Sequence, residues 1–157
     1  SKSIETLCIL RGELNREECQ LVKEAAQEIQ QIMGDWRIIS IDKALDNQIS
    51  KMAPSLQAQH IIIKKRNFRF KVYARPKVTS DILFNILQQL MSSKKINIHL
   101  ITESREPHIV ILVFEAVTQR KPDLSLVKKL CDENQWSMTF TYVSNIGLAT
   151  VRLRIIG

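Results

Sequence analysis

The spacing of apolar residues over the first 34 positions is typical of helices. A short apolar stripe covers residues 4–11, and a longer one follows it. Asn15 and Glu18 have the N-cap and N3 positions of a capping box, and Gly34 is a typical helix end. The longer stripe consists of Val22, Ala25, Ala26, Ile29, Ile32 and Met33. The pattern predicts a helical segment over residues 1–36, with two helices joined by a short link.

From Trp36 onward, short strand patterns alternate with helical ones. Asp42 is a good N-cap for the first of these helices, and Pro54 should bend or end it. We expect two short strands at 60–64 and 68–74 to form a hairpin, because only Lys65, Arg66 and Asn67 separate them. The predicted strands are 36–41, 60–64, 68–74, 96–102, 108–116, 137–143 and 148–155, and the predicted helices start near 42, 76 and 123.

This order of elements predicts an α+β fold. Helices interleaved with antiparallel hairpins favour a two-layer α/β sandwich, in which a mixed, mostly antiparallel sheet carries its helices on one face. We therefore divide the chain into an N-terminal helical segment, 1–36, and an α/β sandwich, 37–157. The helical segment could pair with a second copy to give a homodimer, or fold back on the sheet.

Composition narrows the class of protein. The chain has 157 residues, 45% of them hydrophobic, and this is enough for the core of one ordinary domain with a short appendage. Its apolar runs are too short to span a membrane, so we expect a soluble, cytoplasmic protein. The three cysteines are widely spaced without a metal-site pattern, which predicts reduced thiols and no metal. The net charge of +7 suits an acidic protein or a nucleic acid as partner.

One segment carries a more specific motif. Residues 74–91 read Ala-Arg-Pro-Lys-Val-Thr-Ser-Asp-Ile-Leu-Phe-Asn-Ile-Leu-Gln-Gln-Leu-Met. This resembles the histidine-kinase segment Ala-Asp-Pro, a spacer, and Leu-Leu-Asn-Leu-Leu-Ser-Asn-Ala, in which the second Asn holds the magnesium of ATP. Asn85 falls on the first Asn, whereas Gln89 stands in place of the second and Arg75 in place of an acidic residue.

Two further stretches, 124–130 and 147–153, resemble the second glycine box and the closing strand of the same family. The resemblance spans about residues 38–155. It implies the ATPase domain fold that histidine kinases share with gyrase, MutL and the heat-shock ninety chaperones, the GHKL group.

The chain departs from the family where nucleotide should bind. The family has Asp-x-Gly-x-Gly after the strand that ends at Phe114, but here only Glu115 could read adenine, and a solvated strand end is its ordinary role. Lys121 and Asp123 replace the phosphate-binding glycines, and Asp123 suits a helix N-cap. Five residues between Glu115 and Lys121 are too few for the family's mobile lid.

These departures predict a pseudokinase without ATPase or kinase activity and without a cofactor or metal. The degenerate site positions are Asn85, Gln89, Glu115 and Asp123. None of the three histidines lies on a predicted helix, so phosphotransfer requires a histidine-bearing helix upstream of Ser1. The arrangement resembles the ATP-free histidine phosphotransferases of bacterial phosphorelays.

The resemblance implies a two-component signalling role in which the domain docks a response-regulator receiver domain. A basic face would suit such an acidic partner. Nucleic-acid binding by the same face is the alternative, although Phe68 and Phe70 should point away from the cations and leave Tyr73 as the one aromatic beside them. A divergent active ATPase is a third possibility. The candidate partner-binding residues are Lys64, Lys65, Arg66, Arg69, Lys71, Arg75 and Lys77.

Overall fold

The computed structural model describes residues 16–33 and 35–157. The chain divides into two compact units, with the boundary between Asp35 and Trp36. In the first unit, α2 (Arg16–Met33) confirms the second predicted helix, and its first turn carries Glu17 and Glu18 near the positive end of the helix dipole. The other predicted helix, over residues 1–12, and the proposed cap at Asn15 lie outside the described residues.

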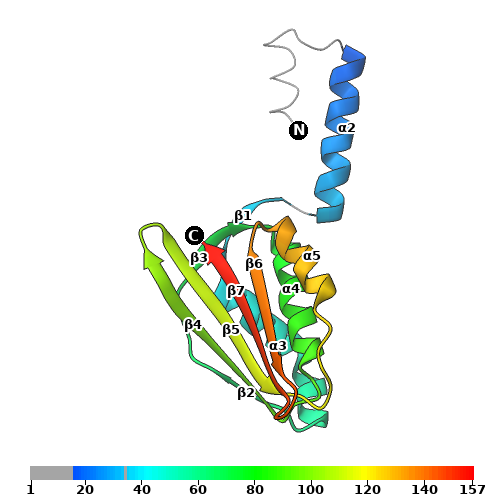
Figure 1. The fold of residues 1–157 in the computed structure, drawn as a ribbon. Coiled ribbons are helices and arrows are strands. Elements are labelled where there is room, and N and C mark those ends of the chain that lie inside the picture. The colour runs from blue at the N-terminus through cyan, green and yellow to red at the C-terminus, as the bar shows by residue number, and fades with distance from the viewer. Residues whose placement is uncertain (1–15, 34) are drawn as a thin grey trace. The chain divides into compact units, whose positions relative to one another are not determined.

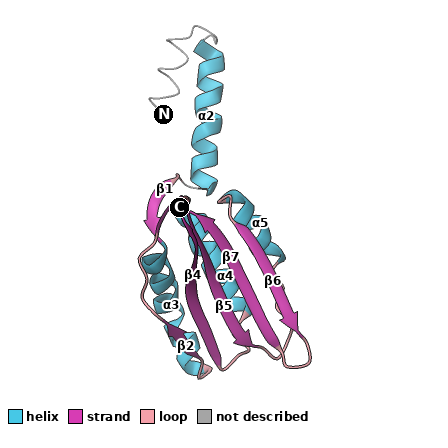
Figure 2. Ribbon diagram, turned by 60° about the vertical axis from the view of Figure 1, so that its left-hand side comes forward, coloured by secondary structure: helices cyan, strands magenta, loops and turns pink. Residues whose placement is uncertain are grey.

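The second unit is a two-layer α/β sandwich, as predicted. Its main sheet has five strands in the order β2-β4-β5-β7-β6, with β2 parallel to β4 and all other pairs antiparallel. Figures 1 and 2 show the helices on one face of this sheet. The strands are β2 (Ile62–Lys65), β4 (Lys95–Arg105), β5 (His108–Val117), β6 (Ser137–Val143) and β7 (Leu148–Ile156), and the helices are α3 (Ile41–Ala58), α4 (Pro76–Gln89) and α5 (Ser125–Glu133).

The core lies between the helices and the inner face of the sheet. Phe114 on β5 is completely buried, and so are Leu153 on β7 and Ile82 on α4. Strand residues alternate between this core and the opposite face, which we call the open face. No helix in the described part of the chain is long and apolar enough to span a membrane.

The predicted hairpin between residues 60 and 74 was wrong. The first of its strands, β2, pairs in parallel with β4, whereas β3 (Lys71–Ala74) pairs with β1 (Arg37–Ser40) in a separate two-stranded sheet. The loop between β2 and β3 carries the chain from one sheet to the other, and Phe70 O accepts a hydrogen bond from Ile41 N. Proximity in sequence therefore did not give the pairing partner.

Two details of the helix starts and ends also differ from expectation. The N-cap of α3 is Ser40, whose Oγ accepts the backbone N–H of Lys43 at 3.4 Å. The predicted N-cap, Asp42, lies in the first turn of the helix instead. Pro54 does not end α3, which continues to Ala58. Pro54 is exposed, so the carbonyl that loses its helical partner there remains close to water.

Candidate functional site

The C-terminal half of α4 carries two of the four positions that the sequence marked as degenerate. Pro76 occupies the first turn of the helix, where its missing N–H costs nothing. Asn85 and Gln89 are one helical turn apart and lie near the other end. Asn85 donates its Nδ2 hydrogen to the backbone oxygen of Asp81 at 2.7 Å, so its amide bonds to its own helix.

Gln89 holds the loop between β5 and α5. Its Oε1 accepts the backbone N–H of Asp123 at 2.9 Å. A second bond lies nearby, because Ser92 Oγ accepts the backbone N–H of Gln119 at 3.2 Å. The loop over residues 118–124 is therefore attached at two points, to the last residue of α4 through the side-chain oxygen of Gln89 and to the following turn through Ser92.

Asp123 lies just before the N-cap of α5 and bonds to the first residue of that helix. Its Oδ1 accepts both the backbone N–H of Ser125, at 3.1 Å, and the Ser125 hydroxyl, at 2.8 Å. These hydrogen bonds lower the pKa of the Asp123 carboxyl below its ordinary value. The predicted N-cap at Asp123 was therefore one residue off, because the N-cap is Leu124, and Asp123 satisfies the first N–H of the helix from the position before it.

The other side of the loop is fixed to the turn between β6 and β7. Thr118 donates its backbone N–H to the oxygen of Gly147 at 2.8 Å and its hydroxyl to the oxygen of Arg120. Gly147 has φ of +68°, and a Cβ at this position would lie 2.6 Å from Thr118 O. Glycine is therefore required by backbone conformation and by space.

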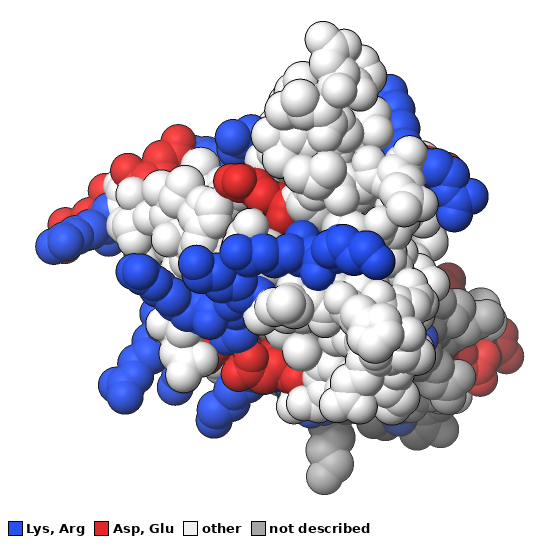
Figure 3. All heavy atoms as spheres, turned by 90° about the horizontal axis from the view of Figure 1, so that it is seen from below, with Lys and Arg blue, Asp and Glu red and all other residues white. Residues whose placement is uncertain are grey.

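A polar pocket of about 560 Å³ lies between α4 and this loop. Arg120 and Lys121 supply its cations, and Asp123, already bonded to Ser125, supplies its one carboxylate. Figure 3 views this end of the second unit and shows a surface rich in lysine and arginine. The lining residues are Gln59, Gln88, Gln89, Met91, Ser92, Arg120, Lys121, Pro122 and Asp123.

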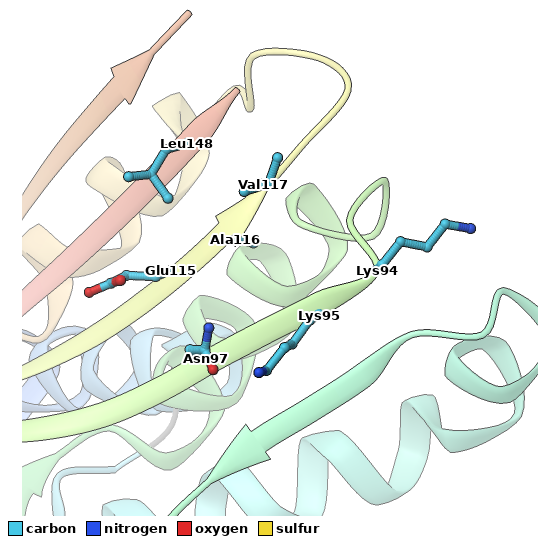
Figure 4. Close-up of a pocket in the computed structure, with 7 residues that line it drawn as sticks. All are labelled: Lys94, Lys95, Asn97, Glu115, Ala116, Val117 and Leu148. Atoms are coloured by element: carbon cyan, nitrogen blue, oxygen red, sulfur yellow. The ribbon is translucent and has the colours of Figure 1, made fainter. Parts of the chain in front are cut away.

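Glu115 does not join this group. Its neighbours Phe114 and Ala116 point into the core, so Glu115 lies on the open face of the sheet, with Oε1 4.0 Å from His99 Nε2. A shallow pocket of about 280 Å³ beside it also contains Lys94 and Lys95 (Figure 4). Of the four predicted positions, the structure joins Gln89 to Asp123, whereas Asn85 bonds to its own helix one turn away.

Lys65 is not available to a partner. Its Nζ forms ion pairs with Asp42 and Asp46 of α3, the second at 3.0 Å, and only 8% of its side chain is exposed. Burial by itself would lower the pKa of this ammonium group, but the hydrogen bonds to both aspartates outweigh that effect and raise it. The group joins β2 to α3.

Arg75 has a structural role that the sequence did not indicate. Its guanidinium carbon lies 5.0 Å from the ring centre of Trp36, and Trp36 stacks on Tyr73 with 5.5 Å between ring centres. The predicted alternation along β3 is correct, because Phe70 and Val72 are buried and Tyr73 is exposed. The remaining exposed members of the predicted basic set are Lys64, Arg66, Arg69, Lys71 and Lys77.

Asn134 is a second structural residue that the sequence did not indicate. It is 3% exposed and follows α5, where its Oδ1 accepts the backbone N–H of Arg75 at 3.1 Å and its Nδ2 donates to Thr79 Oγ1 at 2.9 Å. The residue thus joins the end of α5 to the start of α4. No group of three or more potential metal ligands occurs within the described residues.

The fold has many solved counterparts. No protein-family model matches the chain, and no curated protein matches it. The mycobacterial sensor histidine kinase MprB superposes with a TM-score of 0.67 at 10% identity, covering 78% of this chain and 98% of its own. The ATP-binding domain of PrrB from Mycobacterium tuberculosis gives 0.65 at 14% identity, with the same coverage.

The histidine kinase AdeS of Acinetobacter baumannii gives a TM-score of 0.66 at 8% identity and covers 99% of this chain and 93% of its own. Such low identities concern the fold alone. The architecture that the sequence resemblance implied is confirmed: the α/β sandwich of this chain has the fold of the ATP-binding domain of histidine kinases.

Proposed function

We propose that residues 36–157 form a docking domain with the histidine-kinase ATPase fold that binds an acidic protein partner, a response-regulator receiver domain, without using ATP. The observation that carries this proposal is the hydrogen bond from Asp123 N–H to Gln89 Oε1. An amide oxygen that already accepts a backbone donor is a poor magnesium ligand, because Mg²⁺ requires near-ideal octahedral geometry.

The short loop supports the same conclusion. Only residues 118–124 connect β5 to α5, and Ser92, Gln89 and Gly147 each hold part of this segment. A segment fixed at three points lacks the freedom to close over a triphosphate. A phosphate group bound at the start of α5 would also have to displace the Asp123 carboxylate, which already accepts the N–H and the hydroxyl of Ser125.

Calorimetry tests the absence of nucleotide binding. We expect no heat of binding when the protein is titrated with a non-hydrolysable ATP analogue and magnesium. Micromolar affinity would overturn the proposal. Gln89→Asn is the informative variant, because it restores the family's residue while shortening the side chain that reaches Asp123. It should loosen the loop without creating magnesium-dependent binding.

The exposed cations on the segment from Arg66 to Lys71 are the proposed contact surface. Arg69 and Lys71 alternate with buried Phe70 and Val72, so their side chains point away from the core. Receiver domains carry an acidic cluster, and opposite charges accelerate and orient the encounter. We therefore propose that these cations face the receiver.

Binding of purified receiver domains, measured by biolayer interferometry, tests this surface. The double charge reversal R69E/K71E should weaken binding about tenfold, since charge pairs at an interface contribute on the order of 1 kcal/mol or more. K128E/K129E on α5 is the charge-matched control and should retain affinity. Equal loss in both double variants would contradict the proposed surface.

Nucleic-acid binding remains the second candidate because of one observation. Half-buried Trp36 and exposed Tyr73 form an aromatic stack beside Arg75, and aromatic rings next to a cation are the kind of surface on which bases stack. A fluorescence titration with mixed-sequence single-stranded DNA distinguishes the two candidates. Tight, salt-dependent binding that is lost in Tyr73→Ala, together with no affinity for any receiver, would favour this second function.

A further inference from the structure

The strand β6 is an unprotected edge of the main sheet. In the part of the chain that the structure describes, β7 is the one strand that pairs with β6, and Figure 2 shows β6 at the margin of the sheet. An edge strand offers a row of unpaired N–H and C=O groups to any compatible strand. Such edges invite pairing unless the sequence prevents it.

The sequence of β6 contains none of the usual protections. It reads Ser-Met-Thr-Phe-Thr-Tyr-Val, with no charged residue, proline or glycine, and most of its residues have high β propensity. The opposite edge is different: β2 has four residues, and two of them are Lys64 and Lys65. The contrast between the two edges points to β6 as the edge left open for pairing.

The inner face of β6 is incompletely covered. Met138, Phe140 and Tyr142 pack against the core but are only partly buried, and the two aromatic ring centres are 6.5 Å apart. On the open face, Thr139 and Thr141 are exposed between Ser137 and Val143. A further strand beside β6 would cover the remaining apolar surface on the inner face.

The side chains of β6 are complementary to themselves. If a second copy pairs antiparallel with all seven residues aligned, Phe140 lies opposite Phe140 of the second copy, and Met138 lies opposite its Tyr142. On the open face, Thr139 lies opposite Thr141 in both directions. Aromatic pairs, methionine–aromatic pairs and threonine pairs all favour strand association, and no like charges face one another.

We propose that β6 pairs antiparallel with β6 of a second copy of this chain, which joins the two main sheets into one continuous sheet. The two-fold axis is perpendicular to the sheet, midway between Phe140 of one copy and Phe140 of the other, and leaves helices α3, α4 and α5 of both copies on the same face. This pairing is independent of any contact between the N-terminal helices and of the proposed docking function.

Paired glutamates test the interface. In T139E/T141E, each new carboxylate would face another across the axis, whereas within one copy Thr139 lies beside Arg152, which tolerates a glutamate. Sedimentation should show dimer formation by the unmodified chain and a dissociation constant raised about tenfold or more in this variant. T139E/T141K, in which opposite charges face each other, should restore the dimer.

N47E/S50E on α3 is the charge-matched control, since both positions are exposed and remote from β6 in the fold, and it should associate like the unmodified chain. A purely monomeric protein up to millimolar concentration would overturn the proposal. It would equally be overturned if T139E/T141E and T139E/T141K associate alike, because the contact would then lie elsewhere.

Cross-linking tests the register. In a C8S/C19S background, the cysteines of T139C/T141C would face each other in the dimer, at a distance close to that of a disulfide. Oxidation should give a covalent dimer within minutes, whereas N47C/S50C should remain monomeric. Equal cross-linking of both variants, or of neither, would refute this register.

Discussion

Replacing Asn134 by alanine should destabilise the second unit by about 3 kcal/mol. The side chain is 3% exposed and makes two hydrogen bonds to α4 and its cap, through Arg75 N–H and Thr79 Oγ1. Each bond contributes about 1 kcal/mol, and the buried groups left unpaired add a desolvation cost of roughly 1 kcal/mol or more. Thr79 is fully buried, so water cannot easily replace the lost partner.

Urea denaturation followed by circular dichroism measures this loss. Asn47→Ala on α3 is the matched control because Asn47 is exposed, and it should change the free energy of unfolding by less than about 0.5 kcal/mol. Asn134→Asp separates hydrogen bonding from charge: it keeps the oxygen that accepts Arg75 N–H but buries a carboxylate, so it should be more harmful at neutral pH than in mild acid.

A double-mutant cycle with Thr79→Val isolates the link between the helices. The two changes should be non-additive by about 1 kcal/mol, since each removes the same bond. The reasoning fails if Asn134→Ala costs no more than Asn47→Ala, or if the cycle shows additivity. Either result would mean that the bridge between α4 and α5 does not stabilise the sandwich.

Three further outcomes follow from the structure. Lys65→Met should lower the free energy of unfolding by about 2 kcal/mol in the same urea assay, because it leaves Asp42 and Asp46 close together without their cation. The folded state raises the pKa of Lys65, so this stability difference should be complete at every pH below the ordinary value of 10.5. It should disappear only as the pH rises above the pKa of the folded state. Burial raises the pKa of Cys131 to about 12, so a variant with Cys131 as its single cysteine should react with a thiol reagent only after unfolding. Gly147→Ala should lower stability by about 2 kcal/mol in the same urea assay, because it combines positive φ with a clash at Thr118 O, and a loss below about 0.5 kcal/mol would refute the clash.

The periodic elements could be predicted because their signals are local. The apolar spacing of Ile82, Leu83, Ile86 and Leu87 specifies the buried face of α4, and each of these residues is at most 1% exposed. The alternation of apolar and basic residues over 68–74 likewise predicted the buried side of Phe70 correctly. Since one face of each element is apolar, the sequence alone indicated the two layers.

The features that sequence reasoning missed join distant positions. Asn134 and Thr79 are 55 residues apart, and Asp123 and Gln89 are 34 apart. A single polar residue carries no periodic signal, so its partner depends on how the helices pack. The same limit explains why the predicted hairpin of β2 and β3 was wrong. Strands β1 and β2 are equally short, and no local sequence signal determines which of them pairs with β3.

The attachment of β1 has a consequence for local opening of the second unit. Only four residues of β1 pair with β3, and neither strand belongs to the five-stranded sheet. Beyond this pairing, Ile39 packs against the edge of the core, and Trp36, the residue before β1, stacks on Tyr73. We expect amide hydrogens of Ile38 and Ile39 to exchange with solvent far sooner than those of β5, because β1 can detach while the main sheet stays folded. We therefore expect a force applied to the chain at Asp35 to separate β1 from β3 before any strand of the main sheet. Strand β1 is thus the part of the sandwich that would detach first under tension from the preceding segment.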